Sequence, residues 1–163
     1  MTKIQRMVLL IMLLFTLGSS FKIDNFSWDN YNGTSFVTDV RNQNFPAACN
    51  SGWALSAVDL INSRIKIDRN AQSPDVSISA QVLLSCDNYD YGCLGGEPLS
   101  AFRWIIANNI TDESCHSYAA KGYTNGYGCS SIAKCQSCSN NTCKSVPNSK
   151  IYALNDYGTI GGV

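Results

Sequence analysis

The sequence predicts a mainly α-helical domain whose irregular loops are held together by disulfide bonds. Two observations lead to this fold class. A broad apolar stripe at helical spacing runs from Trp53 to Ile67. Five of the eight cysteines lie among Gly, Ser, Asn and Tyr in residues 109–149, a composition typical of loops. The 163 residues suffice for one domain with a sizeable core, and no internal repeat is visible.

The first 20 residues have the pattern of a signal peptide. Lys3 and Arg6 precede an apolar stretch at positions 7–17, and small residues follow at 18–20. This stretch is shorter than the roughly 20 residues that span a membrane, although an uncleaved anchor is the alternative. We expect residues 1–20 to be removed, residues 21–163 to fold, and the product to enter the secretory pathway without a membrane attachment.

An even number of cysteines behind a signal peptide indicates a disulfide framework. Two alternatives use the same residues: Cys129, Cys135, Cys138 and Cys143 have the spacing of a zinc site, and Cys135 with Cys138 spells a redox CxxC pair. The secretory route disfavours zinc, and the surrounding Gly, Ser and Asn disfavour the redox motif. We therefore expect no metal and no cofactor.

Charge and glycosylation motifs agree with this picture. Twelve basic and twelve acidic residues cancel, and neither sign clusters, so we expect no nucleic-acid partner and no polybasic membrane contact. Four Asn-x-Ser/Thr motifs fit a secretory route and are candidate glycosylation sites: Asn25, Asn32, Asn109 and Asn140.

Three helices are expected after an extended, turn-rich segment at 21–50. The first begins near Ser51, which would serve as its N-cap, and fades near Arg69. Its stripe is broad enough for a helix buried on most sides, and the residues that form it are Trp53, Ala54, Ala57, Val58, Leu60, Ile61, Ile65 and Ile67.

The later elements are shorter. Ser77 can cap a second helix that ends near Cys86, and Pro98 suits the first turn of a third helix. Residues 109–149 should have little regular structure, and a strand could begin at 151–154.

Four motifs resemble those of papain-type cysteine peptidases, in the family's order. Residues 43–54 resemble the active-site segment, in which Cys-Gly-Ser-Cys-Trp opens a long helix and the second Cys is the nucleophile. The other three are Ser79-x-Gln81-x-Leu83-Leu84-x-Cys86, Gly92-Cys93-Leu94-Gly95-Gly96, and Asp112-Glu113-Ser114-Cys115 followed by Tyr118-x-Ala120-Lys121.

The last motif resembles the cathepsin X branch, also called cathepsin Z. Gln43 lies nine residues before the nucleophile position, where most of the family has six, and the cysteine spacing after Cys129 is also similar. The resemblance implies an α+β, papain-like fold, of which residues 21–163 would form the helical half with an incomplete β-barrel half. It also implies a destination outside the cell or in a lysosome or vacuole.

The resemblance places Gly52 at the position of the nucleophilic cysteine. A thiolate at a helix N-terminus beside a histidine attacks the peptide carbonyl, and glycine offers no nucleophile, acid or base. The neighbouring hydroxyl of Ser51 would face another way, so we do not expect it to substitute. Gln43 takes the oxyanion-hole position.

The partner base is also missing from the predicted site. Family members place His and Asn about 130–150 residues beyond the nucleophile, and 111 residues follow Gly52. The single histidine, His116, is expected to be an exposed loop residue. The branch's substrate-anchoring mini-loop histidine corresponds to Asn44.

The resemblance further implies substrate-binding roles for Trp53, Gly95 and Gly96, although positive φ angles in a turn would explain the two glycines equally well. It implies the disulfides Cys49–Cys93, Cys86–Cys129, Cys115–Cys135 and Cys138–Cys143. These pairs leave no free thiol.

We therefore expect a papain-like, cathepsin X/Z-like peptidase homologue that is catalytically inactive as written. One alternative is a fragment or mis-assembled version of an active lysosomal or secreted cysteine carboxypeptidase. Another is a non-enzymatic secreted module that binds a peptide or a protein inhibitor. The surface that would face the barrel half is expected to be apolar and prone to association.

Overall fold

The computed structural model describes residues 26–161. The predicted signal peptide and the candidate glycosylation site Asn25 lie outside these residues. The described elements follow one another in this order: α2 (Gly52–Asp68), α3 (Ala80–Cys86), the 3₁₀ turn η1 (Gly92–Leu94), α4 (Pro98–Asn108), the 3₁₀ turn η2 (Tyr123–Asn125), α5 (Ser131–Lys134), β1 (Gln136–Ser139) and β2 (Thr142–Ser145).

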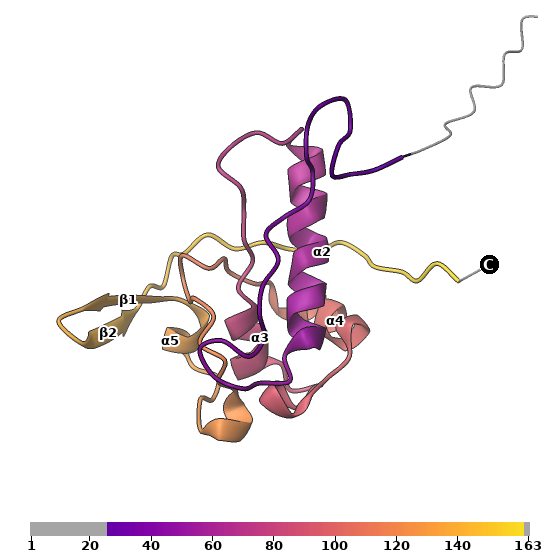
Figure 1. Ribbon diagram of the computed structural model, residues 1–163. Coiled ribbons are helices and arrows are strands. Elements are labelled where there is room, and N and C mark those ends of the chain that lie inside the picture. The colour runs from indigo at the N-terminus through magenta and orange to yellow at the C-terminus, as the bar shows by residue number, and fades with distance from the viewer. Residues whose placement is uncertain (1–25, 162–163) are drawn as a thin grey trace, which may run out of the picture.

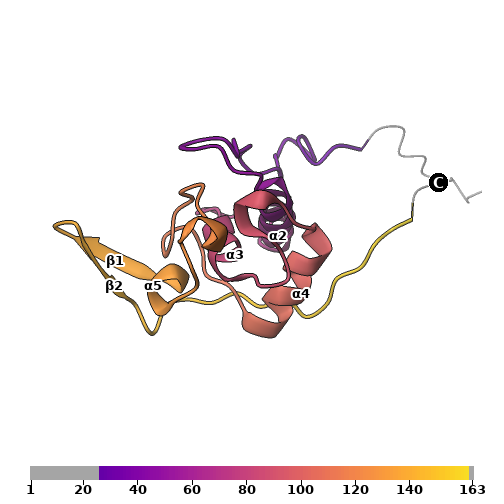
Figure 2. The ribbon, with the colours of Figure 1, turned by 90° about the horizontal axis from the view of Figure 1, so that it is seen from below.

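Helix α2 stands at the centre of the molecule, and α3 and α4 pack beside its N-terminal half (Figures 1 and 2). Its predicted apolar stripe supplies much of the core, with Ala54, Ala57 and Val58 fully buried. The small alanines let α3 and α4 approach closely, and Leu83, Leu84 and Ile105 fill the space between the helices. The helix ends at Asp68, as predicted.

Helix α3 is capped by Ser79, so the prediction that Ser77 caps it was wrong. The Ser79 hydroxyl accepts a hydrogen bond from the Val82 N–H at 3.3 Å and donates one to the carbonyl of His116. The backbone carbonyl of Ser77 instead accepts from the Glu113 N–H at 2.8 Å. The two serines are two residues apart, and their tertiary contacts, which the local sequence does not reveal, distinguish them.

The fully buried Gln81 fastens α3 to the chain segment at 119–121. Its amide nitrogen donates to Ser85 Oγ and to the carbonyl of Lys121, and its Oε1 accepts from the Ala119 N–H at 2.9 Å. A buried side-chain amide is stable only with such partners. Gln81 therefore has a structural role that accounts for its place in the second motif.

Residues 109–149 contain more regular structure than predicted. The short helix α5 is followed by the antiparallel hairpin β1–β2, which projects away from the helical core (Figure 1). At 151–154 only Tyr152 pairs, in an isolated bridge with Ile110, so a strand does not form there in the described residues. The hairpin is short and exposed, and the cystine within it compensates for its lack of a core.

Four disulfides join the cysteines in the same pairs that the family resemblance implies: Cys49–Cys93, Cys86–Cys129, Cys115–Cys135 and Cys138–Cys143. The cysteines considered as a zinc set are thus divided among three disulfides, and the two of the CxxC pair have different partners. None of the helices within residues 26–161 combines the length and the apolar character of a membrane span.

Candidate active site

Gly52 is the first residue of α2 and is exposed at its N-terminal end. The side chain of Gln43 lies against it: Gln43 Oε1 is 3.3 Å from the point that a Cβ on residue 52 would occupy. The two residues that sequence motifs paired as nucleophile and oxyanion positions are therefore neighbours. The free N–H groups and the dipole of a long helix favour negative charge at this point.

Three links hold the start of α2 to the loop at residues 92–96. The Cys49–Cys93 disulfide joins the two segments covalently. The Asn50 N–H donates to the carbonyl of Cys93 at 3.0 Å, and the Trp53 indole N–H donates to the carbonyl of Gly92 at 3.1 Å. Because Trp53 is buried by these contacts, its role in the structure is to join two walls of the site.

On its other side, the start of α2 is held by the hydroxyl of Tyr118. This hydroxyl donates to the backbone carbonyl of Gln43 at 2.7 Å, so in its contact with Ser51 the serine Oγ must be the donor. Ser51 occupies the N-cap position of α2, as predicted, but it is fully buried and its side chain makes no capping hydrogen bond. A buried hydroxyl that donates to Tyr118 is not available as a nucleophile.

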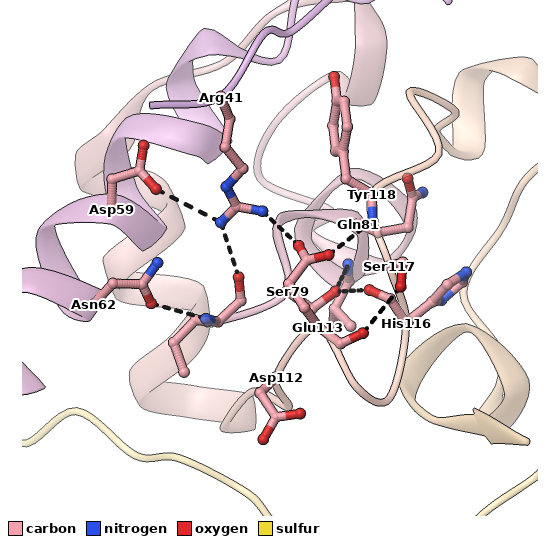
Figure 3. Close-up of polar contacts among 12 residues, drawn as sticks. Arg41, Asp59, Asn62, Ser79, Gln81, Asp112, Glu113, His116, Ser117 and Tyr118 are labelled. Atoms are coloured by element: carbon pink, nitrogen blue, oxygen red, sulfur yellow. Dashed lines mark hydrogen bonds and ion pairs between the residues drawn. The ribbon is translucent and has the colours of Figure 1, made fainter. Parts of the chain in front are cut away.

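An ion-pair network positions Tyr118 (Figure 3). Arg41 donates to Glu113 Oε1 at 2.6 Å and to the carbonyl of Ile78, and its guanidinium lies 3.6 Å from Asp59. The second oxygen of Glu113 accepts from the Tyr118 N–H at 3.0 Å. The network connects α2 to residues 113–118, and Arg41 lies two residues before Gln43.

Burial changes the acid–base behaviour of two members of this network. It raises the pKa of Asp59, an effect that Arg41 opposes and Glu113 reinforces. It also raises the pKa of Tyr118, against smaller opposing effects of the Ser51 hydrogen bond and of Arg41. The Tyr118 hydroxyl therefore stays protonated near neutral pH and keeps its proton for the Gln43 carbonyl.

Gly95 and Gly96 form the glycine wall, the end of the loop that is linked to the start of α2, and a larger side chain fits poorly at either position. Gly95 has φ 125°, a conformation that other residues rarely adopt. A Cβ on Gly96 would lie 2.6 Å from Trp53 Cδ2 and 2.7 Å from Asp90 Oδ1. Within the described residues, neither the N–H nor the C=O of the exposed Gly96 has a hydrogen-bond partner.

Two buried carboxyl groups, Asp87 and Asp90, lie shortly before this wall in the chain, and Asp90 holds the residues that follow it. Asp90 accepts from the Glu97 N–H at 2.8 Å and from the Ser100 hydroxyl at 2.6 Å. Asp87 accepts from the Tyr89 N–H at 2.8 Å, and its other oxygen is buried without a partner among the described residues. Burial, reinforced by the charge of Asp90, raises the pKa of Asp87 to about 7.

His116 is buried, so the prediction of an exposed loop residue was wrong. The residue is 3% exposed, Nδ1 lies 2.7 Å from the carbonyl of Ala133, and the ring packs near Tyr127. Loop composition predicted exposure, but α5 folds over this loop and covers the ring. None of its hydrogen bonds involves residues 43–53.

The protein-family comparison decides the ancestry of this arrangement. Residues 23–160 match the family model described as papain family cysteine protease. The chain belongs to the papain family of cysteine proteases. Its mixture of helices and short strands is the papain-like α+β fold, and a partial domain of that fold fits the incomplete half expected from the sequence.

Similar proteins fit the cathepsin Z-like branch of the papain family. The chain is 34% identical over 136 residues to cathepsin Z of Onchocerca volvulus, which covers 83% of this chain and 43% of that protein. It is 40% identical over 88 residues to cathepsin S of Bos taurus, covering 52% of this chain and 25% of the relative. The chain thus spans less than half the length of these curated relatives.

One solved structure of the family overlays a large part of the chain. Digestive procathepsin L2 from the larval midgut of Tenebrio molitor has a TM-score of 0.57 and 28% sequence identity, covering 74% of this chain and 36% of that one. This match shows that the chain has the fold of the corresponding part of a papain-family proteinase.

The structure brings together the residues that the motifs singled out, namely Gln43, Gly52, Trp53, Gly95 and Gly96. Their family roles in catalysis and substrate binding stay predictions. The sequence did not reveal that the Tyr118 hydroxyl joins Gln43 to Ser51. It also did not reveal that Asp90 binds Glu97 and Ser100, which follow Gly96. The only sequence signal for Tyr118 was its place in the fourth motif, which carries no indication of its partners. Asn44 is exposed in the turn beside Gln43.

Gly96→Ala should destabilise the fold. The added methyl group would meet the Trp53 ring and the Asp90 carboxylate, and such overpacking costs about 1–3 kcal/mol of unfolding free energy. Denaturant unfolding measures the loss. Gly158→Ala is the matched control, because nothing lies within 4 Å of its Cβ position. Equal stability of the two variants would contradict the contact.

Asp87 should make the protein less stable as pH rises. Its pKa is about 7 in the folded chain and near 3.9 in an unfolded one, so the folded state binds the extra proton between these values. The contribution is fully present below about pH 4 and is lost by about pH 7, with a span of at most about 4 kcal/mol.

Asp87→Asn, which mimics the protonated acid, should remove this decline from unfolding curves measured at several pH values. The exposed Asp39→Asn should retain it. An unchanged pH profile in Asp87→Asn would show that Asp87 is not the group responsible.

Proposed function

We propose that this chain is a secretory papain-family homologue that no longer hydrolyses peptide bonds. One observation carries the proposal: the residue at the start of α2 beside the Gln43 side chain is glycine. The nearest side chains with nucleophilic atoms are engaged, since Cys49 is in a disulfide and Ser51 is buried against Tyr118. Without an attacking atom, the helix dipole and Gln43 have no intermediate to stabilise.

The four disulfides support the proposed passage through the oxidising secretory pathway, since such bonds persist in secreted and lysosomal proteins. Papain-family cathepsins are typically found in those compartments. We propose a signal peptide at residues 1–20, a folded part at 21–163, and a destination outside the cell or in a lysosome or vacuole. An acidic destination would also suit Asp87, whose burial favours the protonated form.

A second candidate function is the retention of peptide binding without cleavage. Papain-family proteases act on peptides and bind inhibitors. The exposed N–H and C=O of Gly96 have no partner among the described residues. An extended peptide can pair with such a backbone edge. The exposed side chains of Leu60 and Ile106, on α2 and α4, further support the proposal that the helical half associates with another surface.

The alternative of a fragment or mis-assembled version of an active cysteine carboxypeptidase predicts a different transcript. A longer reading frame with cysteine at position 52 and a downstream histidine and asparagine would favour it. A transcript that encodes glycine at position 52 supports the inactive homologue, whatever follows Val163.

Gly52→Cys in the 163-residue chain should gain a reactive thiol without gaining peptidase activity. The Cβ fits if Gln43 Oε1 moves by a few tenths of an ångström, and the N-terminus of α2 lowers the pKa of a thiol placed there. His116, the only histidine of the chain, is bound to Ala133 and cannot share the proton.

Labelling by an epoxide-type thiol reagent and hydrolysis of a fluorogenic peptide amide measure the two properties. Gly52→Cys should be labelled faster than the open control Gly158→Cys, and neither variant should release the fluorophore. Turnover by Gly52→Cys would refute the proposal that the 163-residue chain offers no base to a thiol at position 52.

Peptide retention should be visible as a change in the amide resonance of Gly96. We expect a mixture of capped hexapeptides to shift that ¹⁵N–¹H signal, whereas the same peptides with N-methylated backbones, which lack N–H donors, should not. The Gly158 resonance serves as the control. No shift at millimolar peptide would reject the binding candidate and leave the inactive homologue untouched.

A further inference from the structure

A cluster of aromatic side chains covers the loop at 26–36, at the far end of α2 from the candidate active site (Figure 1). Phe26, Trp28 and Tyr31 are 52%, 41% and 44% exposed. Trp28 and Tyr31 pack against Phe36, which is 5% exposed, and Phe26 packs against Trp28 and Tyr31. Ring centroids lie 4.8–6.2 Å apart within the cluster. Water-exposed aromatic groups gathered in this way indicate a surface that something else covers.

The cluster contains a tight hairpin turn. Tyr31 and Thr34 exchange backbone hydrogen bonds, at 2.9 Å from Tyr31 N–H and 3.1 Å from Thr34 N–H. Between them Asn32 has φ 52° and Gly33 has φ 81°. Positive φ at both central positions is the signature of a type I′ turn, for which Asn-Gly is a preferred pair. All four residues are exposed, and nothing lies within 4 Å of the Cβ position of Gly33.

The same turn is a glycosylation motif, Asn32-Gly33-Thr34. Tyr31 directly precedes Asn32 in a turn that is fixed by two hydrogen bonds, and both residues are exposed, so a sugar on the Asn32 amide is attached next to the residue that carries this ring. The open space around Gly33 leaves room for it. The glycosylation motif therefore directly follows Tyr31, one of the four residues of the aromatic cluster.

The other described motifs lack this combination. In Asn109-Ile110-Thr111 the threonine is buried, and its hydroxyl donates to the carbonyl of Lys134 at 2.6 Å. Asn140 occupies a hairpin turn of the same kind, with φ 48° and 62° at Asn140 and Asn141, but the residue before it is Ser139. Asn140 thus provides a matched site without an aromatic neighbour.

We propose that Asn32 carries an N-linked oligosaccharide whose first N-acetylglucosamine packs on the ring of Tyr31. The transfer joins the Asn32 amide nitrogen, which loses one proton, to C1 of the sugar. The bond from C1 to the diphosphate of a lipid-linked oligosaccharide donor breaks, and the lipid diphosphate leaves with the electron pair. The apolar C–H face of the sugar then covers the negative face of the ring.

The attached sugar provides the missing cover for the aromatic cluster. It buries apolar ring surface that residues 26–161 leave exposed, and its hydroxyl groups present a polar exterior in place of the rings. The proposal depends on entry into the secretory pathway and not on the loss of peptidase activity.

Site occupancy is tested on the full chain, placed behind an established secretion signal and expressed in a eukaryotic cell. Glycopeptide mass spectrometry should find Asn32 occupied. An unmodified Asn32 in the secreted product would overturn the proposal. The supplied signal separates this result from any failure of the chain's own N-terminus.

Stacking is tested by a thermal double-mutant cycle. Thr34→Val removes the glycosylation motif without disturbing the Asn-Gly turn, and it should lower the melting temperature by a few degrees, roughly 2–6 °C. Thr34→Val should lower the melting temperature equally in a Tyr31→Phe background, because phenylalanine keeps the ring. In a Tyr31→Leu background, which has no ring, Thr34→Val should cause no such loss. Thr142→Val, the matched change for Asn140, should produce no comparable loss.

Trimming the glycan enzymatically to its first sugar should preserve the stabilisation, because only that sugar contacts the ring. If Thr34→Val causes the same loss in the Tyr31→Leu background as in the unsubstituted chain, the stacking is overturned. An equal effect of Thr34→Val and Thr142→Val would overturn it as well. Upfield ring-current shifts of the first sugar's C–H protons in the unsubstituted protein, absent in Tyr31→Leu, provide the direct spectroscopic sign.

Discussion

The geometry of the candidate active site depends on how the start of α2 is held from both sides. On one side the Tyr118 hydroxyl joins Ser51 to the carbonyl of Gln43. On the other, the Cys49–Cys93 disulfide joins the same segment to the glycine wall. None of these contacts uses the side chain of residue 52. Glycine at a helix position costs up to about 1 kcal/mol relative to alanine. Contacts formed entirely by its neighbours can offset that cost, so the geometry of the site does not depend on a side chain at position 52.

Much of the helical fold could be predicted from the sequence because its signals are local. The apolar stripe of α2 and its flanking residues predicted both ends of that helix to within a residue or two, and Pro98 predicted the start of α4. Motif spacing also paired Gln43 with Gly52, although the sequence alone could not show the contact between them. The short hairpin after α5 was missed, because its exposed strands carry no alternating apolar pattern and depend on a disulfide.

The errors share a physical cause, which is that long-range contacts decide between equivalent local choices. Ser51 holds the N-cap position of α2 as predicted, but its hydroxyl is bound to Tyr118, 67 positions further along the chain, and does not cap the helix. Ser79, and not Ser77, caps α3, and the carbonyl of His116 accepts a hydrogen bond from the Ser79 hydroxyl. His116 lies in a polar loop, and its burial under α5 leaves no trace in the loop's composition.

Membership of the papain family does not by itself make this chain an enzyme, because hydrolysis also needs one sulfur atom at the start of α2. Membership of the papain family fixes the fold of the described part, and hydrolysis by that family needs a thiolate at the start of α2. The most direct measurement is alkylation of the native protein followed by intact mass and peptide sequencing. Our account predicts no alkylation before reduction and eight modified cysteines after it. One alkylated thiol in the unreduced protein, at a cysteine occupying position 52, would contradict it.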